Sequence, residues 1–187
     1  MEVAGIVLAA GAGRRYGRPK GLVRDDAGRA WVALAVEALV AGGCAPVLVV
    51  TGAAADEVAS LVPEPAHVVR APDWASGMSA SLRAALQAVA GVDAAVVTLV
   101  DIPGVTATAV ARLVALAAPD VLARATYSGR PGHPTLLGAQ HFAGVLTAAV
   151  GDQGARAYLA GRDDVRLVEC GDVADGTDVD TPAEITD

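Results

Sequence analysis

Short segments that are apolar at almost every position alternate along this chain with alanine-rich segments long enough to form helices. The apolar segments are rich in valine, which favours strands because its branched side chain packs well on a pleated surface. Nearly continuous apolar runs are typical of strands that are buried on both faces of a parallel sheet. We predict strands at about Val3–Ala9, Pro46–Thr51, His67–Arg70, Ala94–Val100, Asp120–Thr126 and Val165–Glu169.

The alanine-rich segments between these runs are predicted to be helices. Ser76, Thr106 and Asp152 precede or open three of them, and such residues cap helix N-termini. Gly42 and Gly43 follow the first long helix, where a left-handed backbone conformation favours glycine. We predict helices at about Ala30–Ala41, Ala54–Leu61, Gly77–Ala90, Thr106–Ala118 and Asp152–Ala160.

This alternation of strands and helices predicts an α/β fold with βαβ units and a buried parallel sheet. The 187 residues suffice for one domain with a sizeable core, and we assign residues 1–187 to that domain. Ser128–Gly138 breaks the alternation, so we predict an insertion or hairpin near the active face. Ligands of open α/β sheets bind beyond the carboxyl ends of the strands, where we expect the functional residues.

Charge and composition exclude several classes of function. The net charge of −7 argues against general nucleic-acid binding, and aromatic residues, at 3%, are too few for base-stacking platforms. Five of the 14 Lys and Arg residues lie between Arg14 and Arg24, which indicates a local site for a small anion. No apolar run reaches the roughly 18 residues of a membrane span, and Glu2 is unlike a signal peptide. Cys44 and Cys170 lack metal-ligand spacing, so we expect buried thiols in a cytoplasmic protein.

The loop that follows the first strand is the main candidate for phosphate binding. The segment 6–20, IVLAAGAGRRYGRPK, contains Gly11, Gly13 and Gly17 and ends at Lys20, the chain's only lysine. Glycines allow backbone N–H groups to approach an anion, and an ammonium is a compact partner for phosphate oxygens. The loop is neither a P-loop, since Gly21 follows Lys20, nor a dinucleotide fingerprint. The alternative is a solvated basic surface loop.

Carboxylates at two further places could bind a metal ion. Asp101 follows a buried strand, and Mg²⁺ prefers one or two carboxylates together with phosphate oxygens and water. Asp180 belongs to an acidic cluster near the C-terminus and could supply a second carboxylate if that segment returns beside Asp101. The alternatives are a turn aspartate before Pro103 and a solvated acidic tail.

Polar groups at other strand and helix ends complete the set of candidates. The predicted helix that begins at Gly77 could present N–H groups and hydroxyls to a polar ligand, or it could equally be an ordinary capped helix. His133 could contact the substrate or form a hydrogen bond within its loop, and Arg156 could face a second phosphate or lie on a surface helix. Candidates for nucleotide contacts at these ends are Gly52, Gly77, Ser79 and Ser81.

The order of these motifs resembles that of the MobA/MocA-like nucleotidyltransferases, which are relatives of the molybdenum-cofactor cytidylyl- and guanylyltransferases. The motifs are LAAGAGRRYGRPK, W-x-x-GM-x-x-SL, VDIP, GHP, GDQGAR and DVDTPAE, and they cover nearly the whole chain. The resemblance implies a single three-layer α/β/α, Rossmann-like nucleotidyltransferase domain with a mostly parallel sheet. It also implies an NTP substrate, Mg²⁺ as cofactor, a phosphate-bearing acceptor such as molybdopterin, and release of pyrophosphate.

The resemblance also implies roles for individual residues. Arg14, Lys20 and Asp101 would be catalytic, with Asp101 and Asp180 as metal ligands. The nucleotide would contact Leu8, Ala9, Ala10, Gly11, Gly13, Arg14 and Lys20, and the acceptor would contact Gly132, His133, Pro134 and Arg156. CTP is favoured because the loop has LAAG, as in cytidine-using members, whereas LAGG marks guanine-using ones. The alternatives are a guanylyltransferase, another phosphorylated acceptor, or a non-catalytic carrier that hands the cofactor to a molybdoenzyme.

Overall fold

The computed structural model describes residues 1–89 and 91–181. The predicted helix end at Ala90 and residues 182–187 of the predicted domain lie outside the described residues. Within the described chain, no helix combines the length and apolarity needed to cross a membrane.

A seven-stranded, mostly parallel sheet in the order β3-β2-β1-β4-β6-β5-β7 forms the middle of the fold. β6 is the exception, since it runs antiparallel to both of its neighbours, β4 and β5. The strands are β1 (Val3–Leu8), β2 (Val47–Thr51), β3 (His67–Arg70), β4 (Ala94–Leu99), β5 (Leu122–Tyr127), β6 (Arg130–Gly138) and β7 (Val165–Glu169). The six predicted strands are therefore confirmed within one or two residues at each end.

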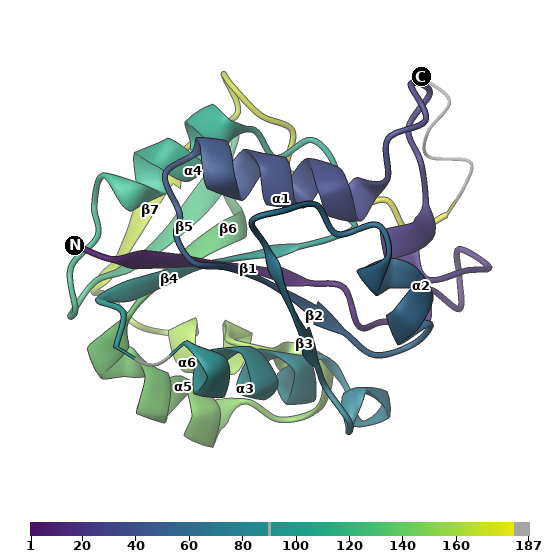
Figure 1. Cartoon of the computed structure of the whole chain (residues 1–187). Helices are drawn as coiled ribbons and strands as arrows, with labels where there is room; N and C mark the ends of the chain where they lie inside the picture. Colours follow the sequence, from purple (N-terminus) through teal and green to yellow (C-terminus); the bar gives the residue numbers. More distant parts are fainter. Residues whose placement is uncertain (90, 182–187) are drawn as a thin grey trace.

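Helices cover both faces of this sheet, so the predicted three-layer α/β/α arrangement is confirmed (Figure 1). The longer helices on one face are α1 (Trp31–Ala41) and α4 (Ala107–Val114), which pack against each other. The opposite face carries α3 (Met78–Ala88), α5 (Phe142–Ala148) and α6 (Arg156–Leu159). The short α2 (Ala55–Ala59) contacts β2.

The central strand β1 shows why this sheet needs a helix layer on each side. Val3 and Val7 pack into the core under α1 and α4, whereas Ala4, Ile6 and Leu8 pack into the core over α3. Successive side chains of a strand point to opposite faces, so a strand apolar at every position must be covered twice. The continuous apolar runs in the sequence thus determine the three layers.

The predicted hairpin at residues 128–138 is confirmed, but its second arm is the interior strand β6 rather than an insertion. Ser128 and Gly129 both have positive φ (51° and 76°), which matches a two-residue hairpin turn between Tyr127 and Arg130. Proline and glycine within β6 conceal the strand in the sequence. Pairing with β4 and β5 on both sides stabilises it.

The helix-cap predictions have mixed outcomes. The Thr106 hydroxyl accepts a hydrogen bond from the backbone N of Ala109 at 3.2 Å, as predicted. Ser76 does not cap α3, because its hydroxyl donates to the carbonyl of Asp73 instead. Asp152 lies in the 3₁₀ turn η4 (Gly151–Gln153), and its carboxylate accepts from the backbone N of Met78 at the start of α3. The predicted helix 152–160 is therefore reduced to the four residues of α6, and α5 was not predicted.

The cap of α4 gives a test of the fold. We expect Thr106→Ala to lower the free energy of unfolding by about 1 kcal/mol, because one backbone N–H at the helix start loses its acceptor. Thr147→Ala is the matched control, since the Thr147 hydroxyl donates to a carbonyl inside α5 and caps no helix end. Urea unfolding of both variants measures the difference. Equal effects of the two substitutions would contradict the assigned cap.

Candidate active site

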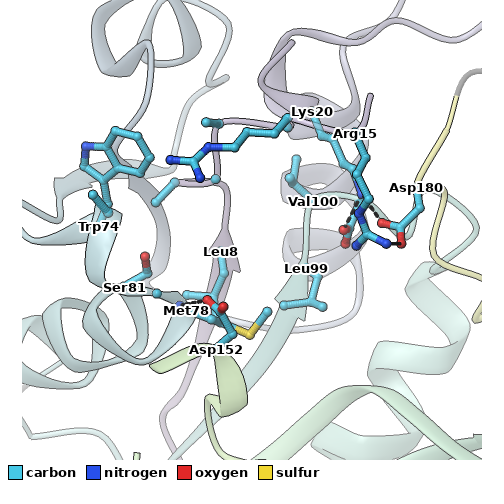
Figure 2. A pocket seen from close by; sticks show the side chains of 18 residues that line it. Leu8, Arg15, Lys20, Trp74, Met78, Ser81, Leu99, Val100, Asp152 and Asp180 are labelled. Carbon is cyan, nitrogen blue, oxygen red and sulfur yellow. Dashed lines mark hydrogen bonds and ion pairs between the residues drawn. The ribbon is translucent and has the colours of Figure 1, made fainter. Parts of the chain in front are cut away.

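A cleft of about 390 Å³ opens at the carboxyl ends of β1 and β4. These strands are parallel neighbours, with Leu8 paired to Leu99, so both end at the same level. From β1 the strand order continues through β2 and β3 on one side, whereas β4 and the later strands lie on the other side of β1. Crevices at such a reversal of strand order are where open α/β sheets bind ligands. Figure 2 shows Trp74 and Ser81 on one wall, with Arg15, Lys20 and Asp180 across the opening.

The glycine-rich loop forms the mouth of this cleft. Gly13 has a φ of +60°, and a Cβ there would lie 1.8 Å from the carbonyl O of Arg18, so only glycine fits. The backbone N of Gly17 donates to the carbonyl of Gly13 at 2.8 Å and closes the loop. A Cβ on Gly11 would meet nothing within 4 Å, which leaves the backbone open to the cleft.

Lys20 forms the centre of a charge cluster at the edge of the cleft. Its Nζ lies 2.9 Å from Oδ2 of Asp101 and 2.8 Å from Oδ1 of Asp180. Arg15 pairs with the other oxygen of Asp180 at 2.8 Å. The Lys20 side chain is only 12% exposed, so solvent screens these interactions weakly. The predicted convergence of Lys20 and Asp101 in one cleft is thus present in the structure.

The cluster shifts the pKa values of Lys20 and Asp180 in opposite directions. Burial works to lower the pKa of Lys20, but hydrogen bonds and attraction from Asp180 and Asp101 outweigh it, so the pKa is raised. The hydrogen bond from Lys20 lowers the pKa of Asp180 despite the partial burial of that carboxyl group. Both groups are therefore held in their charged forms.

Backbone contacts bring Asp180 to the site from the far end of the chain. The backbone N of Val179 donates to the carbonyl of Asp101 at 2.9 Å, which places the following residue beside the Asp101 side chain. The backbone N of Asp175 donates to the carbonyl of Gly104 at 3.1 Å. This segment contains no strand after β7, and Asp180 still lies beside Asp101 as predicted.

The two carboxylates fit a divalent metal ion. Oδ1 of Asp101 is buried and has no hydrogen-bond partner among the residues that the structure describes. A buried carboxylate oxygen without a partner is costly unless a cation or donor meets it. Lys20 already holds a positive charge between Asp101 and Asp180. The described residues contain no group of three or more metal-ligating side chains, so a metal would draw its remaining ligands from substrate and water.

The opposite wall of the cleft depends on a close approach of Trp74. A Cβ on Gly52 would lie 2.4 Å from Cγ of Trp74, so Gly52 makes room for the indole and does not itself line the cleft. Gly77 also allows close packing, because a Cβ there would lie 2.8 Å from Oδ1 of Asp152. The Asp152 carboxylate thus occupies the start of α3, where the sequence predicted a ligand.

The predicted nucleotide and metal residues divide into two groups. Ala9 packs into the core under α1, and Ser79 lines a separate hollow with Arg83. Ser79 is one position beyond Met78, which rotates it about 100° around the helix, whereas Ser81 returns to the face of Met78. Those that line the cleft are Leu8, Ala10, Gly11, Gly13, Arg14, Lys20, Gly77, Ser81, Asp101 and Asp180.

Two of the predicted acceptor residues line a smaller cavity that shares Leu8 and Met78 with the cleft. This second cavity has a volume of about 40 Å³ and includes His133 and Arg156. His133 donates from Nδ1 to the carbonyl of Val97 at 3.3 Å, and burial lowers its pKa. Gly132 and Pro134 do not line it.

The conformation around His133 is fixed by Tyr127. The Tyr127 hydroxyl donates to the carbonyl of His133 at 2.6 Å, and a Cβ on Gly132 would lie 3.1 Å from the Tyr127 ring. Burial raises the pKa of Tyr127 to about 12, so the hydroxyl remains a donor. The absence of a side chain at Gly132 therefore makes room for the Tyr127 ring.

Sequence reasoning missed three residues of these cavities. Arg15 was included only in the basic run, although its ion pair with Asp180 gives it a specific place. Trp74 forms one wall of the cleft and also packs against the core over α3. Arg124, which lines the second cavity, has no local motif that could have identified it.

Comparison with known proteins identifies the family. Residues 5–167 match the sequence pattern of the MobA-like NTP transferase domain. This chain belongs to the MobA-like NTP transferase family. Members of this family typically use a divalent metal ion, in agreement with the two carboxylates of the cleft.

Individual relatives differ in the activities that their names state. The nicotine blue oxidoreductase of Paenarthrobacter nicotinovorans is 39% identical, covering 96% of this chain and 92% of the relative. The crystal structure of Rv0371c from Mycobacterium tuberculosis H37Rv superposes with a TM-score of 0.82 at 26% identity, covering 97% and 94% of the two chains. A nucleotidyl transferase from Methanothermobacter gives a TM-score of 0.75 at 25% identity, covering 90% and 87%.

The charge cluster predicts the pH dependence of stability. Because the pKa of Lys20 is raised, its contribution is complete below about pH 10.5 and is lost as the pH rises through the raised value. Because the pKa of Asp180 is lowered, its contribution is complete above about pH 3.8 and is lost as the pH falls through the lowered value. We expect the free energy of unfolding to fall as the cluster loses charge at either limit.

Lys20→Met tests this account in the acid range. Without the ammonium the two carboxylates repel each other, so protonation relieves the variant while it weakens the wild type. We expect urea unfolding of the two proteins to give free energies that converge as the pH falls below about 4 through the lowered pKa of Asp180. A difference that stays constant over this range would contradict the assigned charge cluster.

Proposed function

We propose that this protein is a cytoplasmic nucleotidyltransferase that moves NMP from an NTP, with CTP favoured, to a phosphate-bearing acceptor. Molybdopterin, the molybdenum cofactor, is the favoured acceptor. The observation that carries the proposal is the convergence of Lys20, Asp101 and Asp180 at the edge of a cleft whose mouth is a glycine-rich loop. Family membership supports the reaction type.

The residues of the cleft have properties that suit a triphosphate. Arg14 and Arg15 lie beside the loop of Gly11 and Gly13, so cationic side chains and open backbone are available together. Lys20 is ammonium throughout the physiological pH range, since its pKa is raised. We assign Lys20 and Arg14 to neutralising charge on the phosphates as the leaving group departs.

The proposed reaction is an in-line displacement at the α-phosphorus. An acceptor phosphate oxygen forms the new P–O bond, while the bond between the α-phosphorus and the bridging oxygen breaks and pyrophosphate leaves with the electron pair. The acceptor needs no general base, because a phosphate monoester is already anionic near neutral pH. The protein therefore contributes positioning and charge neutralisation.

Mg²⁺ is the proposed metal, and Asp101 and Asp180 are the residues that would hold it. When bound, it would supply positive charge that stabilises the phosphoryl oxygens. The buried oxygen of Asp101 that has no hydrogen-bond partner among the described residues supports this assignment. Lys20, which is hydrogen-bonded to both carboxylates, would then be available to the phosphates.

The preference for CTP rests on Ala10. Ala10 lines the cleft, and we infer that its methyl group narrows the space that a purine would need. A guanylyltransferase remains the alternative, as does a transferase for another phosphorylated acceptor. A carrier that delivers cofactor to a molybdoenzyme is a further alternative, but it has little use for Lys20 and Asp101 in one cleft.

The 39% identical relative provides a second candidate function. Its name describes an oxidoreductase acting on nicotine blue, and the similarity extends over 96% of this chain. By that reading the cleft would hold nicotine blue, and the reaction would transfer electrons between this molecule and a separate redox partner. A change in the absorption spectrum of nicotine blue with purified protein and an added electron donor, in the absence of any NTP, would favour this candidate over transfer.

Product identification tests the proposal directly. The purified protein is incubated with Mg²⁺, molybdopterin and each of CTP, GTP, ATP and UTP, and the products are identified by mass. We expect pyrophosphate and a cytidylylated cofactor. Binding of cofactor without turnover of any NTP would favour the carrier, and activity with another acceptor would correct the substrate.

Variants of the cleft residues test the assigned roles. We expect Lys20→Ala to lower turnover by about 10²–10³-fold, because a charge aimed at the transition state is removed. Asp101→Asn should abolish the dependence of the rate on Mg²⁺. Steady-state kinetics with CTP measures both effects, and near-wild-type turnover by the Lys20 variant would remove that residue from the mechanism.

A matched pair of arginines separates specific from general electrostatic effects. Arg14 lines the cleft, whereas Arg18 of the same loop does not. We expect Arg14→Ala to lower kcat/KM for CTP by about tenfold or more, since a charge-assisted contact with phosphate is worth about 1.5–3 kcal/mol. Arg18→Ala should change kcat/KM by less than about twofold, because an exposed charge outside the cleft is screened. Equal losses in the two variants would contradict a specific role for Arg14.

A further inference from the structure

Arg124 is a partly buried cation that the proposed reaction does not yet use. It lies on β5 and lines the second cavity together with Arg156 and His133. Its Nε and one terminal nitrogen donate to the same carbonyl, that of Gly132, both at 3.4 Å. These contacts are long, and they involve only two of the three guanidinium nitrogens, so they use little of the hydrogen-bonding capacity of the group.

The charge of Arg124 lacks the counter-charge found at other arginines. Within the described residues Arg124 forms no ion pair. Five other arginines do pair with a carboxylate: Arg15, Arg29, Arg70, Arg112 and Arg162. Burial, together with repulsion from Arg156, lowers the pKa of Arg124. A guanidinium that is partly desolvated beside a second guanidinium is costly unless an anion binds both.

The position of the second cavity connects it with the reaction. Leu8 and Met78 line both the cleft and the second cavity, so the two spaces adjoin across these side chains. A molecule held in the second cavity can therefore present one end to a nucleotide in the cleft. The planar fork of arginine suits two oxygens of one phosphate group.

We propose that Arg124 and Arg156 together bind the terminal phosphate monoester of the acceptor and so select phosphorylated acceptors. Arg124 is the residue that sets this specificity, because it is held between β6 and the cavity while Arg156 lies on an exposed helical turn. The guanidinium groups would hold two phosphate oxygens and leave the third toward the cleft. This inference rests on the proposed function.

Binding of inorganic phosphate tests the subsite without any turnover. We expect calorimetry to detect phosphate binding to the wild-type protein and a loss of affinity of about tenfold or more in Arg124→Met and in Arg156→Met. Arg83→Met is the matched control, since Arg83 also donates to carbonyls over long distances but lines a different hollow. Its phosphate affinity should equal that of the wild type.

Two outcomes would overturn the subsite. One is unchanged phosphate affinity in Arg124→Met, as expected if phosphate binds only at Arg14 and Lys20 in the cleft. The other is no phosphate binding by the wild type at millimolar concentration. If Arg124→Met does not fold, Arg156→Met decides the question, because its side chain is exposed and its replacement leaves the core intact.

Kinetics then separates this inference from the proposed function. With an active acceptor, Arg124→Met should raise the KM for the acceptor by about tenfold or more and leave the KM for the NTP within about twofold. Arg124→Lys should restore part of the loss, since the charge is kept and the fork is not. An unchanged acceptor KM in an active enzyme defeats the subsite alone. Phosphate binding at Arg124 without transfer of NMP defeats the proposed function alone.

Discussion

The candidate site depends on one ammonium group placed between two carboxylates. Lys20 joins the loop after β1 to the end of β4 through Asp101 and to the C-terminal segment through Asp180. Without a cation between them, two carboxylates at this separation would repel each other in a poorly screened environment. The interaction therefore holds three distant segments of chain together, and it lowers the pKa of the Asp180 carboxyl group. We infer that a metal cation could replace the Lys20 ammonium between the two carboxylates without a change in the backbone around them.

The scaffold that supports this cluster consists of backbone contacts. The parallel register of β1 and β4 makes the loops of Lys20 and Asp101 start side by side. The hydrogen bond from Val179 to the carbonyl of Asp101 then sets the position of Asp180. Tyr127 contributes from the other side, because a Cβ on Gly176 would overlap its ring and glycine lets the C-terminal segment pass close. These backbone contacts thus place the side chains of the cluster close together.

The cleft and the second cavity have contrasting electrostatics. In the cleft, Lys20 and Arg15 are balanced by Asp101 and Asp180, so the cluster is stable before any ligand arrives. In the second cavity, Arg124 faces Arg156 without a carboxylate from the described residues. An acidic protein of net charge −7 could readily have placed a carboxylate there. This imbalance of charge is the basis of the anion subsite that we propose for the second cavity.

The sequence by itself determined the features that depend on neighbouring residues. Continuous apolar runs specified the parallel strands and the two helix layers, Thr106 specified a cap, and Lys20 and Asp101 were found at strand ends. Tertiary structure decided the features that join distant segments: the pairing that makes a strand of the proline-containing β6, the contact of Lys20 with Asp180, and the capping of α3 by Asp152. It also decided that Ser79 faces away from the cleft and that Arg124 faces Arg156. The physical reason is the separation in sequence of the residues involved. Local patterns report a residue's own backbone preference and burial, whereas these contacts depend on how whole elements pack.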